Sequence, residues 1–142
     1  MSTDPTKNIV AGASYGGQAA VFTGLRRLDL FGNVLSLSGS FNFTPDATIV
    51  DSWMIRQFVQ SPRLPLCFYM DVGLLQSVAQ GYRAGLLETN WHMRDVLRAK
   101  GYIVLYAEFS GGHDYVCWRG TLPNGLMALV GRGPRVGGAG RV

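Results

Sequence analysis

The segment Gly12-Ala13-Ser14-Tyr15-Gly16 is a G-x-S-x-G pentapeptide, and its surroundings suit a nucleophilic serine. The apolar run 9–11 before it predicts a strand, and the pattern behind it predicts a helix. A sharp turn between the two would lift the Ser14 hydroxyl out of the interior, with glycines on both sides because a side chain would crowd the neighbouring backbone. The N–H of Tyr15 would then face the oxyanion that forms on attack. The alternatives are a phosphate-binding loop, whose Gly-Lys-Ser/Thr ending is missing here, and a purely structural turn.

His113 is the candidate general base. It stands in Ser110-Gly111-Gly112-His113-Asp114, directly after the last predicted strand. The two glycines leave the loop free to bring the imidazole to the carboxyl ends of the strands, where Ser14 is expected. Histidine titrates in the range needed to accept the proton of a serine hydroxyl. The other histidine, His92, falls inside a predicted helix and is expected at the surface.

The sequence leaves open which residue orients the histidine. Asp71, at the end of the third predicted strand, is the first candidate, because an acid between serine and histidine completes the order of hydrolases with this elbow. Glu88 and Asp114 are further candidates, and Asp71 would otherwise cap a loop or helix. A Ser-His dyad without an acid is also credible, because removing the acid lowers activity without abolishing it.

Strand and helix patterns alternate along the chain. This order predicts an α/β fold, about four mostly parallel strands with helices on both faces. The expected strands are 9–11, 33–38, 66–70 and 102–106. The expected helices are 16–27, 50–60, 90–100 with Asn90 as its cap, and 117–130, and a loop is expected over 72–85. We expect one domain over 1–131 and a flexible Gly/Arg-rich tail over 132–142.

Composition excludes several classes of protein. The 142 residues are 47% hydrophobic and 15% charged, which is typical of a globular domain. No apolar run reaches about 18 residues and the N-terminus lacks the pattern of a signal peptide, so we expect no membrane span and a cytoplasmic location. The net charge of +4 includes three arginines of the tail and does not indicate nucleic-acid binding. Cys67 and Cys117 lack metal-ligand spacing, so no cofactor is expected.

Four segments of the chain carry a family resemblance. Ile9–Gly17, Leu30–Phe41, Phe68–Gly73 and Phe109–Gly120 resemble the Putative esterase (esterase D-like) family, most closely its enterochelin esterase branch. The resemblance implies an α/β-hydrolase that cleaves carboxylic esters through an acyl-enzyme on Ser14, with His113 as base and then acid. Members of the family often place an acid at the position of Gln76, whose amide oxygen could orient the ring instead.

The front of the family fold is not represented here, because about eight residues precede the elbow. The sequence therefore predicts a truncated α/β-hydrolase with Tyr15 as one oxyanion donor and no evident second donor, hence modest activity. The elbow strand would become a sheet edge, and we expect a homo-oligomer that covers residues 7–12 together with Val21 and Leu25 of the first helix. A shallow pocket favours small esters.

The leading hypothesis is a serine carboxylesterase for short-chain acyl esters. Tyr15, Trp53, Tyr115 and Trp118 are expected to line its cleft. The alternative is an inactive half-domain fragment of a siderophore (trilactone) esterase, which acts only as a folded or oligomerising module. A thioesterase or acyltransferase on the same residues is a third class.

Overall fold

Four parallel strands form one sheet in the order β1-β2-β3-β4 in the computed structural model, which describes residues 1–45, 53–77 and 84–131. The strands are β1 (Ile9–Ala13), β2 (Asn33–Leu37), β3 (Cys67–Gly73) and β4 (Ile103–Phe109). Their register pairs Ala13 with Leu37, Leu37 with Asp71 and Asp71 with Ala107. The carboxyl ends of all four strands therefore meet at one edge of the sheet, and the loops that leave it lie side by side.

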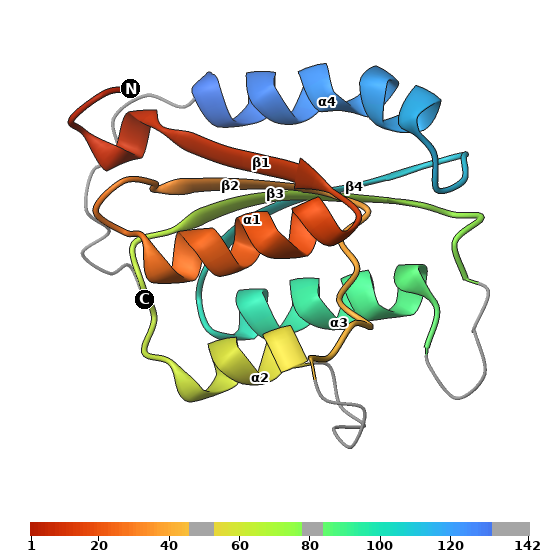
Figure 1. The fold of residues 1–142 in the computed structure, drawn as a ribbon, viewed down its shortest axis with the longest axis horizontal. Coiled ribbons are helices and arrows are strands. Elements are labelled where there is room, and N and C mark those ends of the chain that lie inside the picture. The colour runs from red at the N-terminus through yellow and green to blue at the C-terminus, as the bar shows by residue number, and fades with distance from the viewer. Residues whose placement is uncertain (46–52, 78–83, 132–142) are drawn as a thin grey trace, which may run out of the picture.

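Helices cover both faces of this sheet (Figure 1). On one face lie α1 (Tyr15–Arg26), α2 (Trp53–Gln60) and α3 (Leu86–Ala99), and on the other lies α4 (Tyr115–Val130). A short 3-10 helix, η1 (Pro5–Lys7), precedes β1. The expected parallel α/β-hydrolase sheet is confirmed.

Apolar side chains fill both layers. Val21, Phe58, Met70 and Leu97 belong to the cluster between the sheet and the three helices, and each is fully buried. Leu35 belongs to a second cluster beneath α4. Both faces of β2 and β3 are buried, as is expected for central strands of a parallel sheet.

Several predicted boundaries were wrong. Helix α3 begins at Leu86, not at residue 90, and Asn90 is fully buried with its Nδ2 donating to Gly39 O and Leu86 O at 2.8 Å each. Helix α4 begins at Tyr115, because the Asp114 side chain caps it by accepting from Cys117 N. Strand β3 continues to Gly73, into the predicted loop.

The elbow strand β1 lies at an edge of the sheet, as expected. The first helix does not offer the apolar interface that was predicted, because Val21 is 0% and Leu25 is 9% exposed in the core. The start of the predicted helix 50–60, part of the predicted loop 72–85 and the whole tail 132–142 lie outside the described residues. None of the described helices is long and apolar enough to cross a membrane.

Candidate active site

Ser14 occupies a strained turn between β1 and α1. Its φ of 57° and ψ of −124° lie in a region that residues with a side chain rarely adopt. The turn is fixed by hydrogen bonds: Ser14 N donates to Leu37 O, and the N–H groups of Gly17 and Gln18 donate to Ser14 O. A serine held in this conformation between a strand and a helix has the geometry of the nucleophile elbow that the sequence pattern predicts.

The glycines around the turn do not contribute equally. A Cβ on Gly12 would overlap the backbone carbonyl of Gly16, so Gly12 is required as predicted. A Cβ on Gly16 would meet nothing within 4 Å, and the expected crowding there is wrong. Gly17 is the second restricted position, since its Cβ would lie 2.7 Å from Ser36 Oγ and 3.1 Å from Gly39 Cα. Close packing of α1 on β2 therefore requires the glycine after the pentapeptide.

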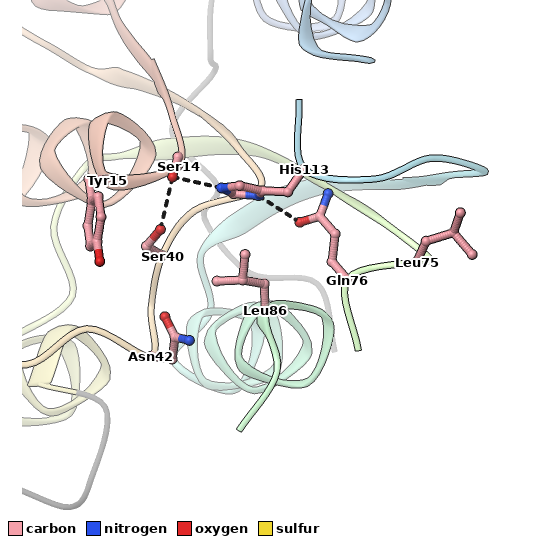
Figure 2. A pocket seen from close by; sticks show the side chains of 8 residues that line it. All are labelled: Ser14, Tyr15, Ser40, Asn42, Leu75, Gln76, Leu86 and His113. Atoms are coloured by element: carbon pink, nitrogen blue, oxygen red, sulfur yellow. Dashed lines mark hydrogen bonds between the residues drawn. The ribbon is translucent and has the colours of Figure 1, made fainter. Parts of the chain in front are cut away.

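His113 reaches Ser14 from the loop after β4. Its Nε2 lies 2.8 Å from Ser14 Oγ, although 99 residues separate the two in sequence (Figure 2). The edge of the imidazole packs on Trp118, with ring centroids 4.9 Å apart. The structure thus brings the predicted nucleophile and the predicted base within hydrogen-bond distance.

Gln76 holds the other nitrogen of His113. Its Oε1 lies 3.2 Å from Nδ1, while its Nε2 donates to Gly112 O at 2.8 Å and to Ser38 Oγ at 3.0 Å. Since a carbonyl oxygen only accepts, the bond to Gly112 fixes which end of the amide faces the ring. Oε1 can then only accept from Nδ1–H. The other ring nitrogen, His113 Nε2, is therefore left unprotonated and can accept the proton of Ser14.

The chain after β3 places Gln76 beside the histidine loop. Leu74 N donates to Phe109 O and Leu75 N donates to Gly111 O, so the two loops are joined by backbone hydrogen bonds. Gln76 N closes a turn on Gly73 O, and the Gln76 side chain is only 6% exposed. This ladder past the sheet edge keeps the amide against the imidazole.

Burial lowers the pKa of His113 below its ordinary value, and the nearby Asp114 carboxylate opposes this in part. A neutral amide at Nδ1 cannot counter the effect as a carboxylate would. The imidazole is therefore neutral, and competent as a base, at neutral pH.

Asp71 lies behind the site and does not contact the imidazole. Its Oδ1 accepts from Ser38 N at 3.3 Å, and its Oδ2 is buried without a hydrogen-bond partner. Burial raises the pKa of this carboxyl to about 6, an effect that Thr121 and the Ser38 N–H partly offset. Ser38, at a φ of 46°, connects the acid to Gln76.

The two ring nitrogens of His113 face Gln76 and Ser14, so neither of the other two acid candidates orients the ring. Asp114 uses one oxygen on Cys117 N and the other on Cys117 Sγ at the start of α4. Glu88 lies in α3 with Oε2 buried and unpartnered. His92 is exposed on α3, as predicted.

Ser40 is a polar neighbour of the nucleophile that the sequence did not reveal. Its Oγ lies 3.2 Å from Ser14 Oγ, and its N–H donates to Ser14 O at 3.0 Å. Because Ser14 gives its own proton to His113, the Ser40 hydroxyl is the donor in this pair. Its position shortly after β2, the strand that pairs with β1, is the feature of the sequence that could have indicated this contact.

Tyr15 begins α1, and its N–H is one of those that a helix start leaves without an intrahelical acceptor. The N–H groups of Gly17 and Gln18 are already used on Ser14 O, so the N–H of Tyr15 is the one next to the nucleophile that remains for a ligand. The Tyr15 N–H therefore lies beside Ser14, where the sequence predicts an oxyanion donor.

A cavity of about 320 Å³ opens over these groups. It is lined by Ser14, Tyr15, Ser40, Asn42, Leu75, Gln76, Leu86 and His113 (Figure 2). Of the four aromatic residues predicted to line the cleft, Tyr15 does so. Trp118 contacts the ring of His113 without lining the cavity, Tyr115 packs on Trp118, and Trp53 lines a neighbouring pocket. The predicted nucleophile Ser14, the predicted base His113, Gln76 and Tyr15 thus surround one space.

Comparison with known proteins adds independent evidence. The model of the family described as Putative esterase matches residues 1–129. The chain is 32% identical to the iron(III) enterobactin esterase of Dickeya dadantii (strain 3937) and 31% identical to the iron(III) salmochelin esterase of an Escherichia coli O6:H1 strain. These alignments cover 92% and 90% of this chain, but only 31% and 32% of the two relatives.

Solved structures agree with the fold. The enterobactin esterase of Shigella flexneri in the presence of enterobactin superposes with a TM-score of 0.76 at 27% identity, over 91% of this chain and 32% of that one. An S-formylglutathione hydrolase from Staphylococcus aureus shares the fold with a TM-score of 0.68 at 18% identity, over 92% of this chain and 53% of that one. The chain spans about a third of the length of the enterobactin esterases it matches.

Proposed function

Since this chain belongs to the Putative esterase family, we propose that it is a serine carboxylesterase that hydrolyses short-chain acyl esters. The observation that carries the proposal is the hydrogen bond of 2.8 Å from Ser14 Oγ to His113 Nε2, at a strained elbow and with Nδ1–H held by Gln76. A hydroxyl becomes a nucleophile when such a base accepts its proton.

The reaction follows from this arrangement. Ser14 Oγ attacks the ester carbonyl carbon while its proton passes to His113 Nε2, and the carbonyl oxygen becomes an oxyanion. As the tetrahedral intermediate collapses, His113 returns that proton to the departing alcohol oxygen, and the acyl group stays on Ser14. A water molecule then gives a proton to His113 and attacks the acyl-enzyme, which releases the carboxylic acid and restores Ser14.

Two donors would stabilise the oxyanion. Tyr15 N–H stands at the positive end of α1, directly after the nucleophile. The Ser40 hydroxyl, 3.2 Å from Ser14 Oγ, is close enough to turn from Ser14 to an oxygen of the intermediate. It supplies a contact that the chain would otherwise lack.

Asp71 acts in this proposal as a positioning residue, through Ser38 and Gln76. Asp71→Asn can keep the bond to Ser38 N but removes the charge behind the imidazole. We expect kcat to fall about two- to fivefold with little change in KM, because a neutral amide accepts the hydrogen bond from Ser38 N more weakly than a carboxylate does. An unchanged kcat would contradict this positioning role.

Substrate size follows from the cavity above Ser14. A space of about 320 Å³ with Leu75 and Leu86 on its walls accepts a small acyl group and a small alcohol. Leu75 is 73% exposed, so a long chain bound there would stay in contact with water.

Hydrolysis of a short-chain nitrophenyl ester tests the function. Ser14→Ala and His113→Ala should each reduce turnover to the background rate, a loss of about a thousandfold or more. Ser77→Ala and His92→Ala are matched controls, since both residues are exposed and outside the cavity. Equal rates for wild type and Ser14→Ala would favour the inactive-module alternative. Faster reaction with the matching thioester would favour a thioesterase.

Self-association is part of the proposal. Among the described residues β1 pairs with β2 alone, and its other edge has backbone groups that can pair with a second copy. We expect sedimentation velocity at micromolar concentration to show a dimer, and Ala11→Pro on this strand to weaken it. A monomer at every concentration would contradict this. We place the protein in the cytoplasm, because its two cysteines lack the spacing of a metal site and a reducing compartment suits them.

A further inference from the structure

Helix α4 is apolar on both of its long sides. The side that faces the sheet buries Trp118, Gly125 and Leu129. The opposite side carries exposed apolar or small residues spaced by three or four, which we call the outer stripe: Val116, Gly120, Pro123, Met127 and Val130. A soluble helix that is apolar all round is normally covered all round, so a binding partner is expected on this side.

The outer stripe is open rather than hollowed. Figure 1 shows α4 alone on its face of the sheet, whereas α1, α2 and α3 share the other face. Val116 is 79% exposed, Met127 65% and Val130 71%. A Cβ added to Gly120 would meet nothing within 4 Å. A single convex helix of this kind suits an extended, flat partner better than a small molecule, which binds in a concave site.

The net charge of the chain lies in the same segment. Four basic residues and no acidic residue follow Asp114 in the sequence: Arg119, Arg132, Arg135 and Arg141. The chain has 13 basic and 9 acidic side chains in all, so residues 1–114 carry equal numbers of the two. The whole formal charge of +4 therefore belongs to residues 115–142. Arg119 is exposed on α4, one turn after Val116.

This charge distinguishes between the possible partners of the outer stripe. Two copies packed with α4 against α4 would bring like charges together, which opposes self-association on this side. An anionic partner attracts the arginines, but the apolar side chains between them also need an apolar layer to enter. A nucleic acid supplies the negative charge without such a layer. The surface of an anionic lipid bilayer supplies both.

We propose that α4 binds the surface of an anionic phospholipid bilayer, with the outer stripe inserted among the lipids and the arginines of residues 115–142 on the phosphate groups. This inference goes beyond the proposed function and does not depend on it. No residue of α4 lines the cavity over Ser14, and α1 and α3 cover the other face of the sheet. We therefore expect a bilayer bound to α4 to leave the hydrolysis of a dissolved ester unchanged.

Flotation of the full chain with lipid vesicles tests the proposal. We expect binding to phosphatidylcholine vesicles that contain about 30% phosphatidylserine, and at least about tenfold weaker binding to phosphatidylcholine alone. Met127→Asp should weaken the binding about tenfold, because it places a charge in the apolar layer. Val59→Asp is the matched control and should bind as wild type, since Val59 is 58% exposed on α2 and the change in charge is the same. Arg119→Gln should weaken the binding about fivefold.

Several results would overturn the proposal. They are no binding of the wild type to either vesicle, equal binding to both vesicles, and equal binding of Met127→Asp and Val59→Asp. A wild-type dimer that Met127→Asp separates in sedimentation velocity would show that a second copy covers the outer stripe instead. Circular dichroism verifies the fold of each variant, and Arg119→Gln decides the matter if Met127→Asp does not fold. Ester hydrolysis without vesicles is measured on the same samples, so loss of lipid binding is distinguishable from loss of the esterase function.

Discussion

Replacing Gln76 by glutamate tests how the neutral amide limits the base. Glutamate has the same length and would place a charged oxygen near Nδ1, which Gln76 Oε1 now approaches to 3.2 Å. An opposite charge at this range raises a histidine pKa by roughly one to three units, and a ring that is only partly buried takes the lower part of that range. One to two units equal about 1.4 to 2.7 kcal/mol of imidazolium stabilisation. Since the imidazolium forms during attack, we expect kcat to rise about 10- to 100-fold.

The same change has a cost in stability. Glutamate lacks the Nε2 donor that Gln76 gives to Gly112 O and Ser38 Oγ. The Ser38 hydroxyl can turn and donate to the new carboxylate, whereas the Gly112 carbonyl cannot. Asp71, which also bonds to Ser38, adds a second acid nearby. We expect the free energy of unfolding to fall by about 1–3 kcal/mol.

Initial rates from about pH 5 to about pH 9 are the assay. In the wild type, burial holds the pKa of His113 below its ordinary value of 6.5, so activity is lost only as the pH falls through that lowered pKa. In Gln76→Glu the acidic limb of the pH–rate profile should move to higher pH, and the plateau rate should rise. Gln76→Ala is the control. Its kcat should fall about 10- to 100-fold, because nothing then fixes the tautomer or the orientation of the His113 ring. A folded Gln76→Glu enzyme with an unmoved limb and a lower plateau would refute the reasoning.

Three further predictions concern the surrounding residues. Ser40→Ala should lower kcat about tenfold with little change in KM in steady-state kinetics; an unchanged kcat would show that the hydroxyl does not assist the intermediate. Asp71→Asn should unfold at higher urea than wild type at pH 8, because the pKa raised from 3.8 to about 6 means that ionised Asp71 costs about 3 kcal/mol above pH 6 and nothing near pH 4. A stability advantage of Asp71→Asn over the wild type that persists at pH 4 would contradict this account. Gly12→Ala should lose about 1–3 kcal/mol through overlap with the Gly16 carbonyl, whereas Gly16→Ala should change stability by less than about 1 kcal/mol, and equal urea midpoints would be the contrary result.

The sequence predicted the parts of the site that are fixed by local chemistry. Ser14 stands in a pentapeptide with a strand before it and a helix behind, and alternation of strands and helices forces a parallel sheet whose carboxyl ends meet. Once that edge exists, a histidine two glycines beyond the last strand has few other places to lie. The approach of His113 to Ser14, at 2.8 Å in the structure, agrees with this topology.

Contacts between separate loops were beyond the sequence. Whether Asp71 or Gln76 faces His113 depends on how far β3 continues and on two backbone hydrogen bonds to the next loop. Ser40 approaches Ser14 because the chain turns back after β2, and no local pattern encodes that turn. Asn90 resembled a helix cap by type, yet tertiary contacts bury it to hold Gly39. Each outcome was decided by packing between segments far apart in sequence.

The strands lie in the sheet in the same order as along the chain, with the nucleophile at one margin and the base carried by the other. The proposed catalysis thus depends on both outermost strands of this sheet, and edge strands are the first to open in local unfolding. Mild heating or dilute denaturant should therefore abolish ester hydrolysis before the amides of the central strands lose their protection from hydrogen–deuterium exchange. The rate of hydrolysis would then report the local unfolding of the two edge strands.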